Sequence, residues 1–267
     1  MYRTKIEDLK TWKNSVSRKP LIIRGARQVG KTWLMKEFGR IHYEQTVYIN
    51  FEKDKRFHSL FTDDFDIKRI ITALKAISGL TIVPEKTLII FDEIQALPEA
   101  ITALKYFQED APSYHIIAAG SLLGMALHSN ISFPAGKVNF MDLSPLTFTE
   151  FLTATGEKSM SEILLSQDWK LITSFKSAFI NHLRQYYYVG GMPEPVQKFT
   201  ENNNFTDVRN IQKEILNTYE LDFSKHAPSD IIPRVRMLWN SIPSQLAKEN
   251  RKFIYGLVKK GSRAKDY

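Results

Sequence analysis

The sequence contains no cysteine among its 267 residues, which excludes disulfide scaffolds, cysteine nucleophiles and thiolate zinc sites. Long apolar runs are missing too: runs such as LII at 21–23 and 88–90 are far shorter than the roughly 20 residues of a membrane span. The first ten residues, MYRTKIEDLK, are charged and lack the apolar core of a signal peptide. We therefore expect a soluble, cytoplasmic protein that does not associate with membranes.

Several catalytic and metal-binding patterns are also absent. The six histidines form no H-E-x-x-H pattern and no pair four residues apart, which argues against a dedicated transition-metal site. The G-x-S-x-G pattern of a hydrolase nucleophile does not occur. Tyr186, Tyr187 and Tyr188 have the composition of a base-stacking surface, but aromatic residues at the end of an amphipathic helix more often belong to a core.

The first half of the chain alternates short β-rich runs with helical patterns, which is typical of a parallel α/β sheet. Apolar residues in 67–77 recur at helical spacing, and Pro98 is suited to the first turn of a helix. We expect a five-stranded parallel sheet with helices on both faces, with strands at 21–24, 47–51, 87–92, 115–120 and 138–143.

After about residue 145 the strand-like runs give way to long amphipathic segments. The chain is therefore divided into a core at 1–145, a helical domain at 146–226 and a third segment at 227–267 that begins with a helix near 231–241. The third segment is strongly basic, because 231–267 holds nine Lys or Arg residues against two acidic residues. Such a segment is consistent with binding to DNA or to an acidic partner, although a solvated helical face is the more usual explanation of such a charge run.

A phosphate-binding motif follows the first strand. The run GARQVGKT fits G-x-x-x-x-G-K-T and lies between a predicted strand and a predicted helix, as the motif requires. Its glycines let successive backbone N–H groups point at a phosphate, and the helix N-terminus adds its dipole. Lys31 is expected to reach the β- and γ-phosphates, and the Thr32 hydroxyl to hold Mg²⁺. The predicted nucleotide-binding residues of the loop are Gly25, Ala26, Arg27, Gln28, Val29, Gly30, Lys31 and Thr32.

Two carboxylates end a later apolar strand, TLIIFDE. Asp92 is placed to position the metal, and Glu93 to activate the attacking water. The same pair is also consistent with simple capping of the next turn. The D-x-x-G and N-K-x-D motifs of GTPases do not occur, and a small-molecule kinase does not normally place a water-activating acid here. ATP hydrolysis is therefore favoured, with phosphotransfer as a distant alternative.

These residues carry a family resemblance over nearly the whole chain. GARQVGKT, TLIIFDEIQALPEA, AAGSLLGM, LSPLTFTEFL and GGMPEP together resemble a bacterial and archaeal group of AAA-type ATPases that usually carry a nuclease-like C-terminal domain of unknown function. The resemblance implies an ATPase core, a helical lid and a winged helix. No nuclease-like domain is recognised here, and 227–267 is interpreted as a partial, truncated winged helix.

The resemblance also implies roles for further residues. Asn50 would hold the catalytic glutamate, and Ser121 would sense the γ-phosphate, although Asn50 also suits a turn and Ser121 a helix cap. Gly191 and Pro193 would bring the lid over the adenine, although they also suit a helix-breaking turn. Lys137 stands where related ATPases often place a basic residue that contacts nucleotide. A lysine lacks the planar fork of the arginine that many of them use.

Two hypotheses follow from the sequence. The first is a Mg²⁺-dependent ATPase with ATP and Mg²⁺ as its ligands, in which Lys31, Asn50, Glu93 and Ser121 serve catalysis. The second is a nucleotide-dependent switch with little turnover, in which ATP presents a surface for DNA or a protein partner, including a second copy of the chain.

Overall fold

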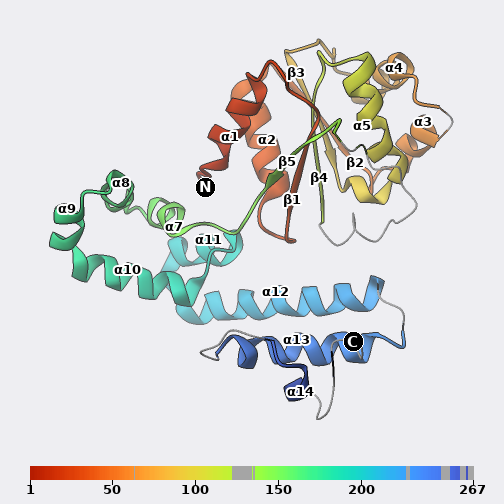
Figure 1. Cartoon of the computed structure of the whole chain (residues 1–267). Coiled ribbons are helices and arrows are strands. Elements are labelled where there is room, and N and C mark those ends of the chain that lie inside the picture. Colours follow the sequence, from red (N-terminus) through yellow and green to blue (C-terminus); the bar gives the residue numbers. More distant parts are fainter. Residues whose placement is uncertain are drawn as a thin grey trace. The chain divides into compact units, whose positions relative to one another are not determined.

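The computed structural model describes residues 1–62, 64–121, 134, 136–226, 229–247, 253–258 and 263 (Figure 1). Contacts among these residues divide the chain into two compact units, Met1–Phe205 and Thr206–Tyr267. Within the described ranges, no helix combines the length and apolarity needed to cross a membrane.

The first unit is built on a five-stranded parallel sheet with strand order β2-β3-β4-β1-β5. β1 lies between β4 and β5, so Leu21 is in register with Ile117 on one side and with Asn139 on the other. The predicted α/β fold and its five strands are confirmed, with ends that differ by at most two residues. The strands are β1 (Leu21–Gly25), β2 (Gln45–Asn50), β3 (Thr87–Asp92), β4 (His115–Ser121) and β5 (Asn139–Asp142).

Helices cover both faces of this sheet, because alternate residues of each strand point to opposite sides. Ile89 and Phe91 of β3 belong to the core beneath α3, α4 and α5, whereas Leu88 and Ile90 belong to the core beneath α1 and α2 (Figure 1). These elements are α1 (Lys5–Lys13), α2 (Lys31–His42), the 3₁₀ turn η1 (Lys55–Phe57), α3 (His58–Thr62), α4 (Ile67–Ser78), the 3₁₀ turn η2 (Ile94–Ala96) and α5 (Pro98–Asp110).

Local sequence signals explain the ends of these helices. The Asp66 side chain accepts hydrogen bonds from the backbone N–H groups of Lys68 and Arg69 and so caps the start of α4. Gly79, with a φ of 68°, ends the same helix. Pro98 occupies the first turn of α5, as predicted.

A helical segment follows the sheet within the first unit. Thr147 and Glu150 form a capping box at the start of α7, in which each side chain accepts from the backbone of the other residue. The segment has a small core of its own around Leu152, Met160 and Phe179. Its helices are α7 (Phe148–Ala154), α8 (Lys158–Ser166), α9 (Trp169–Ser174), α10 (Lys176–Val189) and α11 (Pro193–Asn202).

Within the second unit, the residues that the structure describes form helices. The rings of Tyr219 and Trp239 stack with their centroids 6.0 Å apart, and the Gln245 side chain exchanges two hydrogen bonds with the Ile254 backbone. Residues 227–228, 248–252, 259–262 and 264–267 of the predicted winged-helix segment lie outside the described residues. The elements are α12 (Phe205–His226), which begins at the last residue of the first unit, α13 (Ile232–Leu246) and α14 (Tyr255–Val258).

Candidate nucleotide-binding site

The predicted phosphate loop joins β1 to α2 at the carboxyl edge of the sheet. Gln28 and Gly30 have φ angles of 63° and 92°, which turn the chain back before α2 begins at Lys31. Gly25 is required by a close approach, since an added Cβ would lie 2.4 Å from the Leu143 carbonyl oxygen. The two motif glycines therefore serve different purposes, one a turn and the other a tight contact between β1 and the end of β5.

Lys31 lies inside the curl of this loop. Its Nζ donates hydrogen bonds to the carbonyl oxygens of Gly25 and Ala26, each at 2.9 Å, and the residue is 9% exposed. Burial lowers the pKa of Lys31, while the negative charges of Glu93 and Asp92 act in the opposite direction. The ammonium group is thus held by loop carbonyls on the side of the sheet where both carboxylates lie.

Asp92 contacts Thr32, and the Asp92 carboxylate and the Thr32 hydroxyl are the two groups predicted to hold a metal. Its Oδ2 accepts a hydrogen bond from Thr32 Oγ1 at 2.7 Å and another from the Tyr48 hydroxyl at 2.8 Å. Burial is the main cause that raises the pKa of Tyr48 to about 12, and the hydrogen bond to Asp92 acts in the same direction. The Tyr48 hydroxyl therefore remains a donor. Mg²⁺ prefers hard oxygen ligands and usually takes one or two from the protein, so the Thr32–Asp92 pair fits this ion.

Glu93 adopts the left-handed conformation with a φ of 51°, which is unusual for a residue with a Cβ. Its Oε2 accepts a hydrogen bond from Gln95 Nε2 at 2.5 Å. The other amide atom of Gln95, Oε1, is buried with no hydrogen-bond partner among the described residues. It lies against β4, where a Cβ added at Gly120 would come within 2.5 Å of it. Gln95 therefore holds the Glu93 carboxylate from a position that the sequence analysis did not identify.

Asn50 and Ser121 end the strands on either side of β3. Asn50 is in register with Asp92, and its Oδ1 accepts from the backbone N–H groups of Glu52 and Lys53. Its Nδ2 donates to the Tyr48 hydroxyl at 3.5 Å, so these contacts make a turn beside the site. Ser121 is in register with Gly25 across β4 and β1, and its side chain lies outside the described residues.

The GGMPEP segment meets the phosphate loop through Pro193. A Cβ added at Gly30 would lie 3.6 Å from the Pro193 ring. Gly191 instead contacts the start of the helical segment, where its carbonyl oxygen accepts from the Leu146 N–H at 2.6 Å. A Cβ at Gly191 would lie 2.3 Å from the Leu146 carbonyl oxygen. The segment is thus fixed between the loop and residue 146.

Lys137 lies at the other edge of the sheet. It precedes β5, and because β5 is parallel to β1, its position is at the amino edge, away from the loop that follows β1. Its Nζ forms an ion pair with Glu109 at 2.9 Å, near the end of α5. The structure does not bring Lys137 together with the phosphate loop of its own chain.

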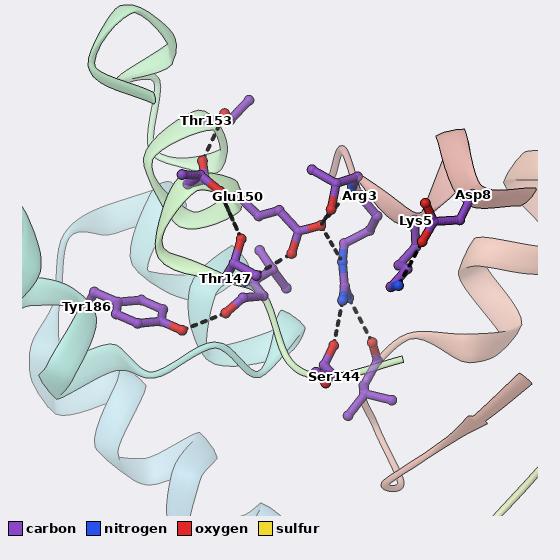
Figure 2. Close-up of polar contacts among 12 residues, drawn as sticks. Arg3, Lys5, Asp8, Ser144, Thr147, Glu150, Thr153 and Tyr186 are labelled. Carbon is purple, nitrogen blue, oxygen red and sulfur yellow. Dashed lines mark hydrogen bonds and ion pairs between the residues drawn. The ribbon is translucent and has the colours of Figure 1, made fainter. Parts of the chain in front are cut away.

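A buried polar cluster that was not predicted also lies beside the loop (Figure 2). Arg3 and Glu150 are 4% and 3% exposed, and they pair between the N-terminal segment and α7. The Tyr186 hydroxyl donates to the Leu146 carbonyl oxygen at 2.7 Å, which links α10 to the same region. The T-x-x-E spacing of Thr147 and Glu150 is a capping-box signal that could have identified the glutamate. Nothing in the local sequence marks Arg3.

A parallel sheet with this loop and a strand-end Asp-Glu pair defines a P-loop nucleoside-triphosphate-binding fold. Residues 17–152, about half of the chain, match the family described as an AAA domain. The chain belongs to that family, and its fold is that of an AAA-type P-loop protein. Residues 180–267 match a family described as a domain of unknown function.

No curated protein matches the chain. Similar solved structures include Cdc6p from Pyrobaculum aerophilum, with 13% identity, a TM-score of 0.35 and coverage of 57% of this chain and 48% of that one. PCH-2 of C. elegans has 12% identity, a TM-score of 0.34 and coverage of 58% and 45%. The chain thus spans about half the length of these two. The Aeropyrum pernix Orc1 protein in complex with DNA has 12% identity, a TM-score of 0.42 and coverage of 97% and 81%. Identities and TM-scores of this size do not bear on function.

Proposed function

We propose that this chain binds ATP at residues 25–32 and hydrolyses it to ADP and phosphate. The observation that carries the proposal is the convergence of Lys31, Thr32, Asp92 and Glu93 around one loop at the carboxyl edge of the sheet. In this assignment the loop amides and the N-terminus of α2 bind the phosphates. Lys31 exchanges its carbonyl contacts for the oxygens of the β- and γ-phosphates.

Thr32 and Asp92 would hold Mg²⁺, which neutralises phosphate charge when bound. Glu93 acts as the base: its carboxylate, oriented by the hydrogen bond from Gln95, accepts a proton from the attacking water. Ser121 is assigned to the γ-phosphate because its backbone lies opposite Gly25. Asn50 is assigned to the same carboxyl edge, as a neighbour of Asp92 rather than a ligand of ATP.

Phosphate release from Mg²⁺-ATP by the full chain tests this assignment, with Lys31→Ala and Glu93→Gln as variants. Lys31→Ala is expected to abolish ATP binding and turnover together. Glu93→Gln is expected to keep ATP affinity within about threefold while lowering kcat by at least about a hundredfold, a typical effect of removing a general base. Turnover that survives in Glu93→Gln would remove Glu93 from the role of base, and turnover that survives in Lys31→Ala would refute the site.

A second function is a nucleotide-dependent switch with little turnover, and one observation favours it. Pro193, at the start of α11, lies against Gly30 of the loop, so a nucleotide that moves the loop also moves the start of α11. Limited proteolysis around 190–195, with and without ATP, tests this function in Glu93→Gln, where hydrolysis is suppressed. An ATP-dependent change in cleavage supports the switch, and identical digestion refutes it.

The larger organisation belongs to the same proposal. Residues 1–145 form the ATPase core, 146–226 the lid that carries Gly191 and Pro193 to the nucleotide, and 227–267 a winged-helix segment. Lys137 contacts nucleotide only across an interface with a second copy, because its own loop lies at the opposite edge. The basic residues of 231–267 make DNA the expected partner. Duplex DNA that raises the ATPase rate would support this partner, and salt-independent or absent binding would refute it.

A further inference from the structure

Arg3 reaches three separate parts of the first unit from a single buried guanidinium group. Nη1 donates to the Val29 carbonyl oxygen at 2.9 Å, Nη2 to the Ser144 carbonyl oxygen at 2.5 Å, and Nε to Glu150 Oε1 at 3.3 Å (Figure 2). One acceptor belongs to the phosphate loop, one to the connection after β5 and one to α7. A planar fork of fixed N–H groups can serve three such acceptors at once, whereas an ammonium group cannot match that geometry.

Glu150 holds this guanidinium in place. Its Oε1 also accepts from the Thr4 N–H at 2.7 Å and from the Thr4 hydroxyl at 2.8 Å, while its Oε2 accepts from the Thr147 N–H at 3.0 Å. Burial raises the pKa of Glu150, but the hydrogen bonds from Thr147 and Thr4, together with the charge of Arg3, bring that pKa below its ordinary value. The carboxylate therefore stays ionised at neutral pH and fixes the N-terminal segment to α7.

The contact to Val29 has a direct consequence for the phosphate loop. The Val29 carbonyl and the Gly30 N–H belong to one planar peptide unit and point in opposite directions. A donor that fixes the carbonyl on one side of the loop also fixes the direction of the Gly30 N–H on the other. Arg3 itself lies close to that unit, since a Cβ at Gly30 would be 3.8 Å from its Nη1 and 3.6 Å from the Pro193 ring.

Stability alone does not account for such a pair. Buried ion pairs contribute little net stability compared with apolar residues of similar volume, because both charges lose their hydration. A buried arginine that binds two backbone carbonyls has its main effect on where those carbonyls are. Here one carbonyl belongs to the loop and the other to Ser144, three residues before the capping box of α7.

We propose that Arg3 is a positioning residue of the nucleotide site: its guanidinium sets the Val29–Gly30 peptide for phosphate binding and couples that peptide, through Ser144 and Glu150, to the helical segment. The proposal rests on the proposed ATP-binding function and adds to it a link between loop and helices. It requires that ATP affinity depends on the planar guanidinium of Arg3. It also requires that ATP binding changes backbone hydrogen exchange at residues 144–150, none of which is assigned to the phosphate site.

The first test is nucleotide affinity in the full chain, measured by displacement of a fluorescent ATP analogue in the presence of Mg²⁺. Arg3→Lys keeps a positive charge beside Glu150 but loses the fork, and we expect ATP affinity to fall about tenfold or more with kcat at saturating ATP within about twofold. The matched control is Arg40→Lys. Arg40 makes a bidentate pair with Glu37 on the exposed surface of α2, and its variant is expected to keep native affinity.

The second test uses the native sequence and does not depend on how any Arg3 variant folds. We expect ATP to slow backbone hydrogen exchange in peptides that cover 144–150, and to leave exchange there unchanged in Lys31→Ala. ATP binding by the native chain without slower exchange at 144–150 would overturn the coupling. Native ATP affinity in a folded Arg3→Lys variant would overturn the positioning role. Failure of the native chain to bind ATP would instead refute the proposed function itself, so the two failures are distinguishable.

Discussion

Replacing Gly191 with alanine places a methyl group where the structure leaves no room for one. The added Cβ would lie 2.3 Å from the Leu146 carbonyl oxygen and 3.0 Å from the Leu146 nitrogen. Both are backbone atoms, so the clash cannot be relieved by turning a side chain. Leu146 itself is 1% exposed, which leaves the connection between β5 and α7 little space to move away.

The expected loss of stability combines steric strain and broken hydrogen bonds. Overpacking a tight site by one methyl group costs about 1–3 kcal/mol. Separation of the two backbones also breaks the Leu146 N–H to Gly191 carbonyl bond and strains the bond from the Tyr186 hydroxyl to the Leu146 carbonyl. At about 1 kcal/mol for each bond, the total is about 3–5 kcal/mol, a large fraction of the stability of an ordinary domain.

Urea unfolding followed by circular dichroism measures this loss, and proteolysis around 190–195 locates it. The control is Gly256→Ala, because a Cβ at Gly256 in α14 meets nothing within 4 Å and its φ is not positive. We expect the control to match the native chain or exceed its stability slightly. A Gly191→Ala variant within 1 kcal/mol of the native chain, with unchanged proteolysis, would refute the argument from close contact.

Three further predictions follow from other contacts. Burial, aided by two nearby cations, lowers the pKa of His115 to about 4 from 6.5, so the unfolded chain takes up the proton at a higher pH than the folded chain does. The free energy of unfolding should therefore fall by about 3 kcal/mol as pH drops from 6.5 through 4. In His115→Gln the fall should be smaller by this amount. Gln95→Leu removes the donor to Glu93 and should lower kcat about tenfold with ATP affinity unchanged; an unchanged kcat would show that this hydrogen bond does not orient the base. Gly39→Ala should destabilise the protein by about 1–3 kcal/mol in urea, because the new Cβ would lie 2.3 Å from Thr46 Oγ1; a gain in stability, usual for alanine in a helix, would contradict the clash.

Local sequence was sufficient where the structure depends on residues close together in the chain. The strands were predictable because each is a short apolar run that both faces of a parallel sheet bury. The phosphate loop was predictable because its turn and its close contact each need a glycine at a fixed offset from Lys31. Asp92 follows from its place at the end of β3, and its contact with Thr32 confirms that the two side chains meet.

Tertiary structure decided which side chains pair across long separations in the chain. Arg3 and Glu150 lie 147 residues apart, and neither sequence window indicates the other. The partner of Glu93 is Gln95 rather than a group on β2, because the left-handed turn at Glu93 directs its carboxylate toward η2. The family resemblance implies that Lys137 lies next to nucleotide, yet the parallel direction of β5 puts it at the amino edge with Glu109.

Local sequence patterns are therefore enough to predict the sheet, the phosphate loop and the Asp92–Glu93 pair, since these depend on backbone conformation and on apolar patterns that are encoded locally. Only the tertiary structure shows that Arg3 binds the Val29 carbonyl of the loop and that Gln95 holds the Glu93 carboxylate. Hydrogen bonds require atoms to lie within about 3 Å of one another, and no spacing rule within a sequence sets such distances between separate elements.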